Sequence, residues 1–154
     1  MQYAKTSKGL FVKSEKTDRS VFSNVILWRP ADERKILLIQ KDGPSEIYKV
    51  IFESRYDKKT NHMQLNVKAD EYGVSIYATE IPERPPADFI LITGKNANDE
   101  DKMDLWLASK TNGNAKRLAI LNKFTSVSIS VADRLIIVLD VNENGDYTPM
   151  KFPY

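Results

Sequence analysis

The chain of 154 residues carries 23 Lys and Arg side chains, 21 Asp and Glu side chains, a single His and no Cys. The absence of thiols excludes a disulfide framework, a thiolate zinc site, an iron–sulfur cluster and a cysteine nucleophile. A hydrophobic fraction of 42% and a charged fraction of 29% exclude collagen-like and wholly disordered chains. We therefore expect one globular domain over residues 1–154, which at this length buries a core without needing a metal.

Basic side chains are concentrated toward the N-terminus, although the net charge of the whole chain is only +2. Residues 1–18 combine Lys, Thr, Ser and Glu with one large apolar cluster, Leu10-Phe11-Val12. This composition predicts either a flexible basic segment or one basic face of the protein.

Alternation of apolar and polar side chains, the pattern of half-buried strands, dominates the rest of the chain. Met63, Leu65 and Val67 alternate with polar residues before a break at residues 70–73, and Val74 and Ile76 then resume the pattern. These two segments predict an antiparallel hairpin in which Val67 pairs with Val74. Further alternating strands are expected at residues 48–53, 103–108 and 126–131.

Four apolar runs without clean alternation, at residues 21–28, 35–40, 89–93 and 135–141, are typical of strands covered on both faces. The Pro-rich residues 81–87 are expected to cross between two β units, because proline lacks an amide donor. Residues 115–123 favour a short helix after Asn114 as a cap. The pair Asn144-Gly145 predicts a tight hairpin.

Together these elements predict an all-β or β-rich fold with about nine short strands built from antiparallel hairpins. The two architectures that fit are an OB-like barrel and a β-sandwich, with at most one or two short helices.

Motifs for catalysis or metal binding fail at a required position. Residues 140–146 begin like a calcium loop, but Lys151 occupies the place of the bidentate glutamate, so we expect a plain hairpin. His62 lies on the polar side of its predicted strand and is expected at the surface. The acidic residues Asp99-Glu100-Asp101 and Asp104 could bind magnesium in a small enzyme, but a solvated loop is the favoured interpretation and this third hypothesis ranks lowest. No phosphate loop, dinucleotide fingerprint or serine nucleophile motif occurs, so we expect no catalysis, no metal and no cofactor.

Aromatic rings at polar positions of the predicted strands carry the leading functional hypothesis. Flat rings beside Lys and Arg suit sequence-tolerant binding of single-stranded nucleic acid, since rings stack on bases and cations contact phosphates. In a sheet covered on both faces, the same rings would belong to the core. The predicted stacking residues are Trp106, Tyr77, Tyr48 and Tyr56, and the predicted phosphate contacts are Lys5, Lys8, Lys13, Lys16, Arg19, Lys58 and Lys59.

The alternative hypothesis is a structural, assembly or adaptor protein. Here exposed aromatics and the C-terminal residues 150–154 would be covered by a protein partner or a second copy. The longest aliphatic run, residues 135–139, is far too short to cross a bilayer, so we expect no membrane association and a cytoplasmic location.

Overall fold

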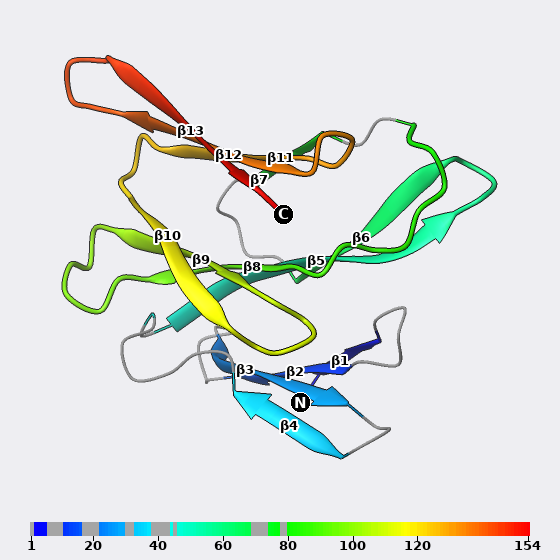
Figure 1. The fold of residues 1–154 in the computed structure, drawn as a ribbon. Helices are drawn as coiled ribbons and strands as arrows, with labels where there is room; N and C mark the ends of the chain where they lie inside the picture. The colour runs from blue at the N-terminus through cyan, green and yellow to red at the C-terminus, as the bar shows by residue number, and fades with distance from the viewer. Residues whose placement is uncertain are drawn as a thin grey trace.

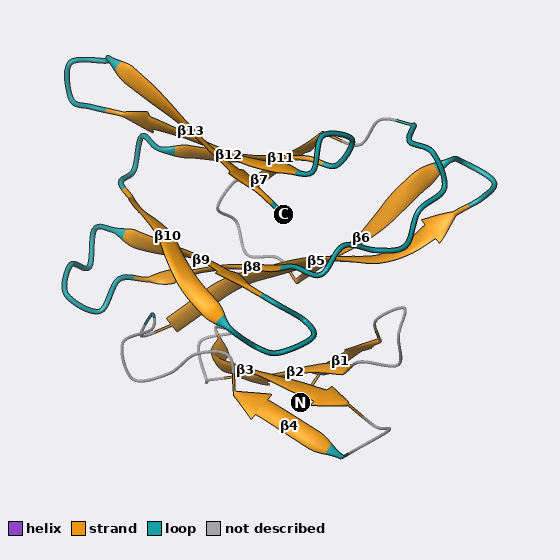
Figure 2. Cartoon of the chain, in the orientation of Figure 1, coloured by secondary structure: helices purple, strands orange, loops and turns teal. Residues whose placement is uncertain are grey.

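The computed structural model describes residues 2–5, 11–16, 22–29, 33–37, 44, 46–68, 74–77 and 80–154. This part of the chain is all-β and contains no helix, as Figure 2 shows. Its thirteen strands form a nine-stranded sheet, called here the large sheet, and a four-stranded sheet, called the small sheet. The prediction of an all-β fold is confirmed, and the described residues form thirteen strands where about nine were predicted.

Neighbouring strands of the large sheet run antiparallel in the order β1-β2-β3-β5-β8-β9-β10, with β4 beside β3 and β6 beside β5. Its strands are β1 (Gln2–Lys5), β2 (Phe11–Lys16), β3 (Phe22–Arg29), β4 (Arg34–Leu37), β5 (Glu46–Asp57), β6 (His62–Lys68), β8 (Ile90–Lys95), β9 (Met103–Ala108) and β10 (Ala115–Leu121). Two of the strands, β1 and β2, lie within the basic N-terminal residues 1–18.

The small sheet has the order β13-β12-β11-β7 and is antiparallel except for the parallel pair β7 and β11. Its strands are β7 (Val74–Tyr77), β11 (Ser126–Ser130), β12 (Leu135–Val141) and β13 (Tyr147–Pro153). The predicted hairpin between residues 135–141 and the C-terminus is confirmed, because β12 and β13 pair through their whole length. Gly145 in its turn has a φ of 84°, a conformation that glycine adopts without strain.

The two sheets share one core, and Figure 1 shows the small sheet lying over β5, β8 and β9. Aliphatic and aromatic side chains from both sheets meet there. The large sheet contributes Ile51, Leu91 and Leu105, the small sheet contributes Val127, Ile129, Ile136 and Val138, and Phe89 and Val131 join the core from positions just outside β8 and β11. The described strands form a layered pair of sheets and do not close into a barrel.

The central strands of the large sheet are buried on both faces, as the apolar run at residues 89–93 predicted. Leu91 faces the shared core, whereas Ile90 and Ile92 point the other way and are also fully buried. In Figure 1, β1–β4, which belong to the same large sheet, lie on that opposite side.

The predicted helix at residues 115–123 is wrong, because Ala115–Leu121 forms β10 and pairs with β9. A bulge shifts the register between Arg117 and Ala119. The extra residue brings Leu118, Ala119 and Leu121 to the core and leaves Ile120 exposed. This interruption of the two-residue period imitates helical spacing in the sequence.

The predicted hairpin of residues 62–68 with 74–79 is also wrong. β6 pairs with β5 across a turn at residues 58–61, so Met63 lies opposite Tyr56. β7 joins the small sheet instead, with Val74 opposite Val127. Alternation identifies the strands and their faces, but it does not say which strand is the neighbour. Residues 80–89 then lead from β7 in the small sheet to β8 in the large sheet.

Candidate interaction surface

A buried carboxylate holds the two sheets together. Glu53 of β5 has no exposed surface, and Arg84 donates to both of its oxygens at 2.6 Å. The backbone N–H of Ala87 donates to the same carboxylate at 2.7 Å. Arg84 also donates to the carbonyl oxygen of Val131, at the end of β11, at 3.2 Å. Paired, bidentate hydrogen bonds of this kind compensate for the desolvation of a buried charge.

The last residue of the sequence completes this cluster. The Tyr154 hydroxyl donates to Glu53 at 3.1 Å, and its ring packs on Phe89 with centroids 3.9 Å apart. Burial raises the pKa of Tyr154, and the Glu53 charge raises it further. Burial alone would raise the pKa of Glu53, but the Arg84 and Ala87 hydrogen bonds and the Arg84 charge bring it below its ordinary value. At neutral pH the Glu53 carboxylate is therefore ionised and the Tyr154 hydroxyl keeps its proton, and their hydrogen bond fixes the end of β13 against the large sheet.

The small sheet turns a second row of aliphatic side chains away from this core. Ile136 and Val138 belong to the core, and successive strand residues point to opposite faces. The residues between and beside them, Leu135, Ile137, Leu139 and Val141, therefore lie on the face directed away from the large sheet, and each is half-buried. We call this the outer face of the small sheet.

The strands that flank this row carry small, hydroxyl-bearing or apolar side chains. The strand register brings Ser128 opposite Ile137, and Ile137 opposite Lys151. Tyr77, which is 61% exposed, lies opposite Ser130 on the same face. The flanking side chains described on the outer face are Ser126, Ser128, Ser130, Tyr77, Tyr147, Pro149, Lys151 and Pro153. Lys151 is the one charged side chain among these and the four aliphatic residues, in a protein with 29% charged residues.

The free edge of β13 is protected against pairing with another strand. Tyr154 donates its backbone N–H to Arg134, so the residues that alternate with it point their backbone groups away from β12. Pro149, Lys151 and Pro153 are in that outward set, and the two prolines have no N–H to offer. Prolines at an edge prevent the addition of a further strand. The edge of β13 is therefore unsuited to pairing with a further strand.

The predicted aromatic residues do not gather on one surface. Tyr77 lies on the outer face of the small sheet, whereas Trp106, Tyr48 and Tyr56 lie on strands of the large sheet. Trp106 is half-buried on the side of β9 opposite the core, facing Arg117. Its Nε1 is buried and has no hydrogen-bond partner among the described residues. Tyr48 is half-buried as well.

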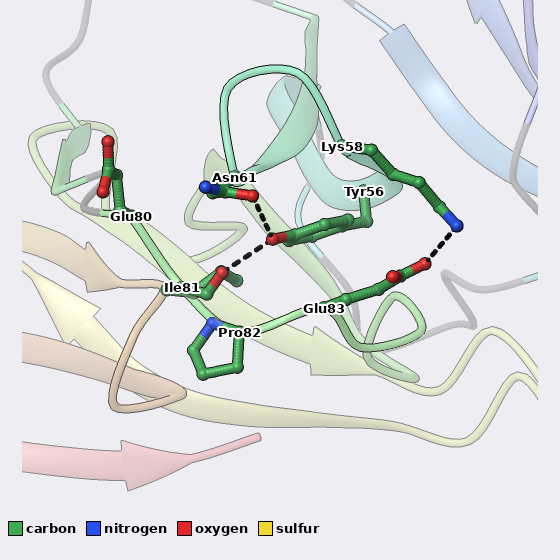
Figure 3. A pocket seen from close by; sticks show the side chains of 7 residues that line it. All are labelled: Tyr56, Lys58, Asn61, Glu80, Ile81, Pro82 and Glu83. Carbon is green, nitrogen blue, oxygen red and sulfur yellow. Dashed lines mark hydrogen bonds and ion pairs between the residues drawn. The ribbon is translucent and has the colours of Figure 1, made fainter.

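Two of the predicted residues meet in the surface pocket drawn in Figure 3, which has a volume of about 450 Å³. The Tyr56 hydroxyl donates to the carbonyl oxygen of Ile81 at 2.8 Å and contacts Asn61. Lys58 forms an ion pair of 2.9 Å with Glu83 at the rim, where both side chains are largely exposed. Tyr56 therefore anchors the connection to β8 through its hydroxyl, and Lys58 is already paired with a carboxylate.

The remaining predicted cations are only partly placed. Lys59 is exposed in the turn between β5 and β6. Lys5, Lys13 and Lys16 lie in β1 and β2, but their side chains are outside the described part of the structure, and Lys8 and Arg19 are outside the described residues altogether.

Groups of three or more potential metal ligands are absent from the described residues. Asp104 is buried and accepts a hydrogen bond of 2.7 Å from Asn96, so it contributes to the β8–β9 turn. Within that same described part, no helix has the length and apolar character of a membrane span.

Glu53 and the outer face were not recognised as functional features from the sequence. The aliphatic run at residues 135–141 was the available signal for the outer face, and Glu53 in phase with the core residue Ile51 was the signal for the buried cluster. Comparison with known protein families, with curated proteins and with solved structures finds no match to this chain.

Proposed function

We propose that the protein is a non-catalytic assembly module that associates with a second copy of itself through the outer face of the small sheet. The observation that carries the proposal is the aliphatic composition of β12 on both of its faces. Leu135 to Leu139 is a continuous aliphatic run, the composition of a strand covered on both sides. One side of β12 packs into the core, and the other has no covering segment among the described residues. A second molecule would supply the missing layer.

The size of the face indicates a weak, concentration-dependent contact. The four strands have 4, 5, 7 and 7 residues. With a rise of about 3.3 Å per residue and a spacing of about 4.8 Å between strands, they cover roughly 360 Å². A standard interface buries about 800 Å² on each partner, so this face alone corresponds to the lower end of protein–protein contacts. We expect a dissociation constant on the order of 10–100 µM.

The charge distribution favours a second copy over a charged partner. The outer face carries Lys151 and no described acidic side chain, so it lacks the charge pattern that selects an unlike partner. A two-fold axis along β12 would place the serine-bearing β11 of one copy against β13 of the other. Lys151 would then face Ser128 instead of its own symmetry mate, and the aliphatic rows would meet at the centre.

The test is a concentration series by sedimentation velocity on the unmodified protein and two lysine variants. Ile137→Lys places a charge at the centre of the outer face. Ile120→Lys is the matched control, because Ile120 is an isoleucine that is 47% exposed on β10 of the large sheet. We expect the unmodified protein and the control to shift from monomer to dimer over the expected concentration range, and Ile137→Lys to remain a monomer.

Two outcomes would count against self-association. The first is that the unmodified protein stays strictly monomeric at concentrations well above about 100 µM. The other is dimerisation of Ile137→Lys to the same extent as the control, which would locate the contact elsewhere on the molecule.

A second candidate function, binding of single-stranded nucleic acid, is favoured by the exposure of Tyr77. Its ring is 61% exposed, although aromatic side chains usually bury most of their surface. Stacking on a base would contribute about 1–3 kcal/mol, and exposed cations such as Lys59 would neutralise phosphates. Because Tyr77 and the other exposed tyrosine of this face, Tyr147, lie at opposite ends of the small sheet, they would not stack on neighbouring bases, and any such binding would be weak and would fall with increasing salt.

Titration of a fluorescent single-stranded oligonucleotide at two salt concentrations tests this candidate. Tyr77→Ala should weaken the binding, whereas Tyr147→Ala, at a tyrosine that is 69% exposed at the distant end of β13, should not. Absence of binding at low salt, or equal binding by both variants, would remove it.

A further inference from the structure

A second pocket, with a volume of about 300 Å³, opens where the two sheets meet beside the C-terminal tyrosine. Its apolar walls are formed by Phe89, Leu107, Ala108, Ala115 and Tyr154. Phe89 and Ala108 are almost completely buried, and Leu107 packs against the core. The pocket is therefore an extension of the hydrophobic core to the surface of the protein.

The mouth of this pocket carries one positive charge that no described residue neutralises. Lys116 of β10 lies directly opposite Leu107 of β9, so the two side chains share the face that lines the pocket. Its side chain is exposed and forms no ion pair with a described residue. The carboxylate of Asp88 also lines the pocket; its oxygens accept hydrogen bonds from Ser109 at 2.7 Å and from the Thr111 backbone at 2.9 Å, and these neutral donors leave its negative charge in place.

We propose that this pocket binds a small amphipathic carboxylate, with the apolar body against Phe89, Leu107 and Tyr154 and the carboxylate beside Lys116. A cavity of about 150 Å³ holds a benzene molecule, so twice that volume accepts a ring with a short side chain. Small-molecule sites combine such an apolar wall with a few polar groups that fix the orientation of the ligand. Lys116 is the one cation among the lining residues, and a ligand carboxylate placed beside it, on the far side from Asp88, would bind more tightly than a neutral or cationic group in the same position.

The aliphatic part of a lysine side chain often covers apolar surface while the ammonium group stays in water. Lys116 could therefore have a purely structural role, in which its side chain only shields the apolar wall of the pocket. The substitution Lys116→Met separates the two roles, because it retains an unbranched apolar stem and removes the charge. Lys123→Met is the matched control, since Lys123 is an exposed lysine in the turn that follows β10 and lies over the ring of Phe124.

The experiment is a titration with hydrocinnamate, followed through the backbone amide signals of the protein by NMR. Its neutral amide and phenylpropylamine serve as probes of similar shape and different charge. We expect hydrocinnamate to bind saturably, to shift the signals of Leu107, Ala108 and Ala115, and to bind about three- to tenfold more tightly than the amide. Lys116→Met should reduce its affinity to that of the amide, and Lys123→Met should leave the affinity unchanged.

Four results would overturn the proposal. They are absence of saturable binding up to about 10 mM, equal binding of all three probes, unchanged affinity in Lys116→Met, and signal changes confined to residues outside the pocket. A further variant, Ala115→Leu, fills the pocket from its rim and should abolish binding in a protein that keeps the native amide spectrum; retained binding in that variant would also overturn the proposal.

Discussion

Replacement of Arg84 by methionine should destabilise the protein strongly. Arg84 supplies two hydrogen bonds of 2.6 Å and the compensating charge to Glu53, whose side chain is completely buried. Without the guanidinium, the carboxylate retains the Ala87 amide and the Tyr154 hydroxyl, but no cation. Removing one partner of a buried ion pair costs about 3–5 kcal/mol, because the other charge remains desolvated. For a protein of this size, that corresponds to a fall in Tm of roughly 6–20 °C.

The pH dependence of this loss has a definite sign. In the unmodified protein the folded-state pKa of Glu53 lies below its ordinary value of 4.5. Its contribution to stability is therefore present above pH 4.5 and disappears as the pH falls through the lower, folded-state pKa. In Arg84→Met, burial without a cation raises the pKa of Glu53, and protonation relieves the penalty. The difference in stability between the two proteins should therefore shrink as the pH is lowered from neutral toward 4.5.

Urea denaturation at neutral pH and at lower pH would measure these differences in unfolding free energy. The double variant Glu53→Gln/Arg84→Met should be more stable at neutral pH than Arg84→Met alone, because no charge is left buried. Lys58→Met, which breaks the exposed ion pair with Glu83, is the control and should leave Tm essentially unchanged. Two results would contradict this prediction. One is a loss of unfolding free energy below about 1 kcal/mol for Arg84→Met at neutral pH; the other is a double variant whose loss equals the sum of the losses for Glu53→Gln and Arg84→Met.

Two further predictions concern the backbone. Gly94→Ala should lower the unfolding free energy by about 1–3 kcal/mol in the same urea assay, because an added Cβ would overlap the carbonyl oxygen of Glu46 and the ring of Pro44; unchanged stability would contradict this close approach. Replacing Pro149 and Pro153 together by threonine restores two outward N–H groups on the edge of β13, and we expect concentration-dependent turbidity and thioflavin fluorescence. A double variant as soluble as the unmodified protein would show that the prolines do not protect this edge.

Several strands and their faces follow from local sequence, whereas the pairing of neighbouring strands does not; in β5 the side of the strand that carries Lys49 and Glu53 is buried although its polar residues predicted exposure. The period of two around Val127 and Ile129 and the turn at Asn144-Gly145 are local signals, and both agree with the structure. The bulge after Arg117 disturbs that period within β10, which explains the wrongly predicted helix. The choice of β5 as the partner of β6 depends on contacts across the whole fold, which alternation does not encode.

The buried cluster around Glu53 and the outer face also combine local signals with contacts that only the fold reveals. Glu53 lies 31 residues from Arg84 and 101 residues from Tyr154, so no short motif could reveal their meeting. The aliphatic run at residues 135–141 predicted a strand covered on both faces. The structure covers one face of that strand, and the uncovered row around Ile137 becomes informative only when the fold is known.

The most direct test of self-association through the outer face is chemical cross-linking of single cysteines introduced into this cysteine-free chain. A cysteine in place of Ile137 would lie near the two-fold axis, across a gap of about 10 Å between packed sheets, within reach of a short bismaleimide. We expect covalent dimers of Ile137→Cys and none of Ile120→Cys at the same concentration. Equal yields from the two variants, or no dimer from Ile137→Cys, would contradict it.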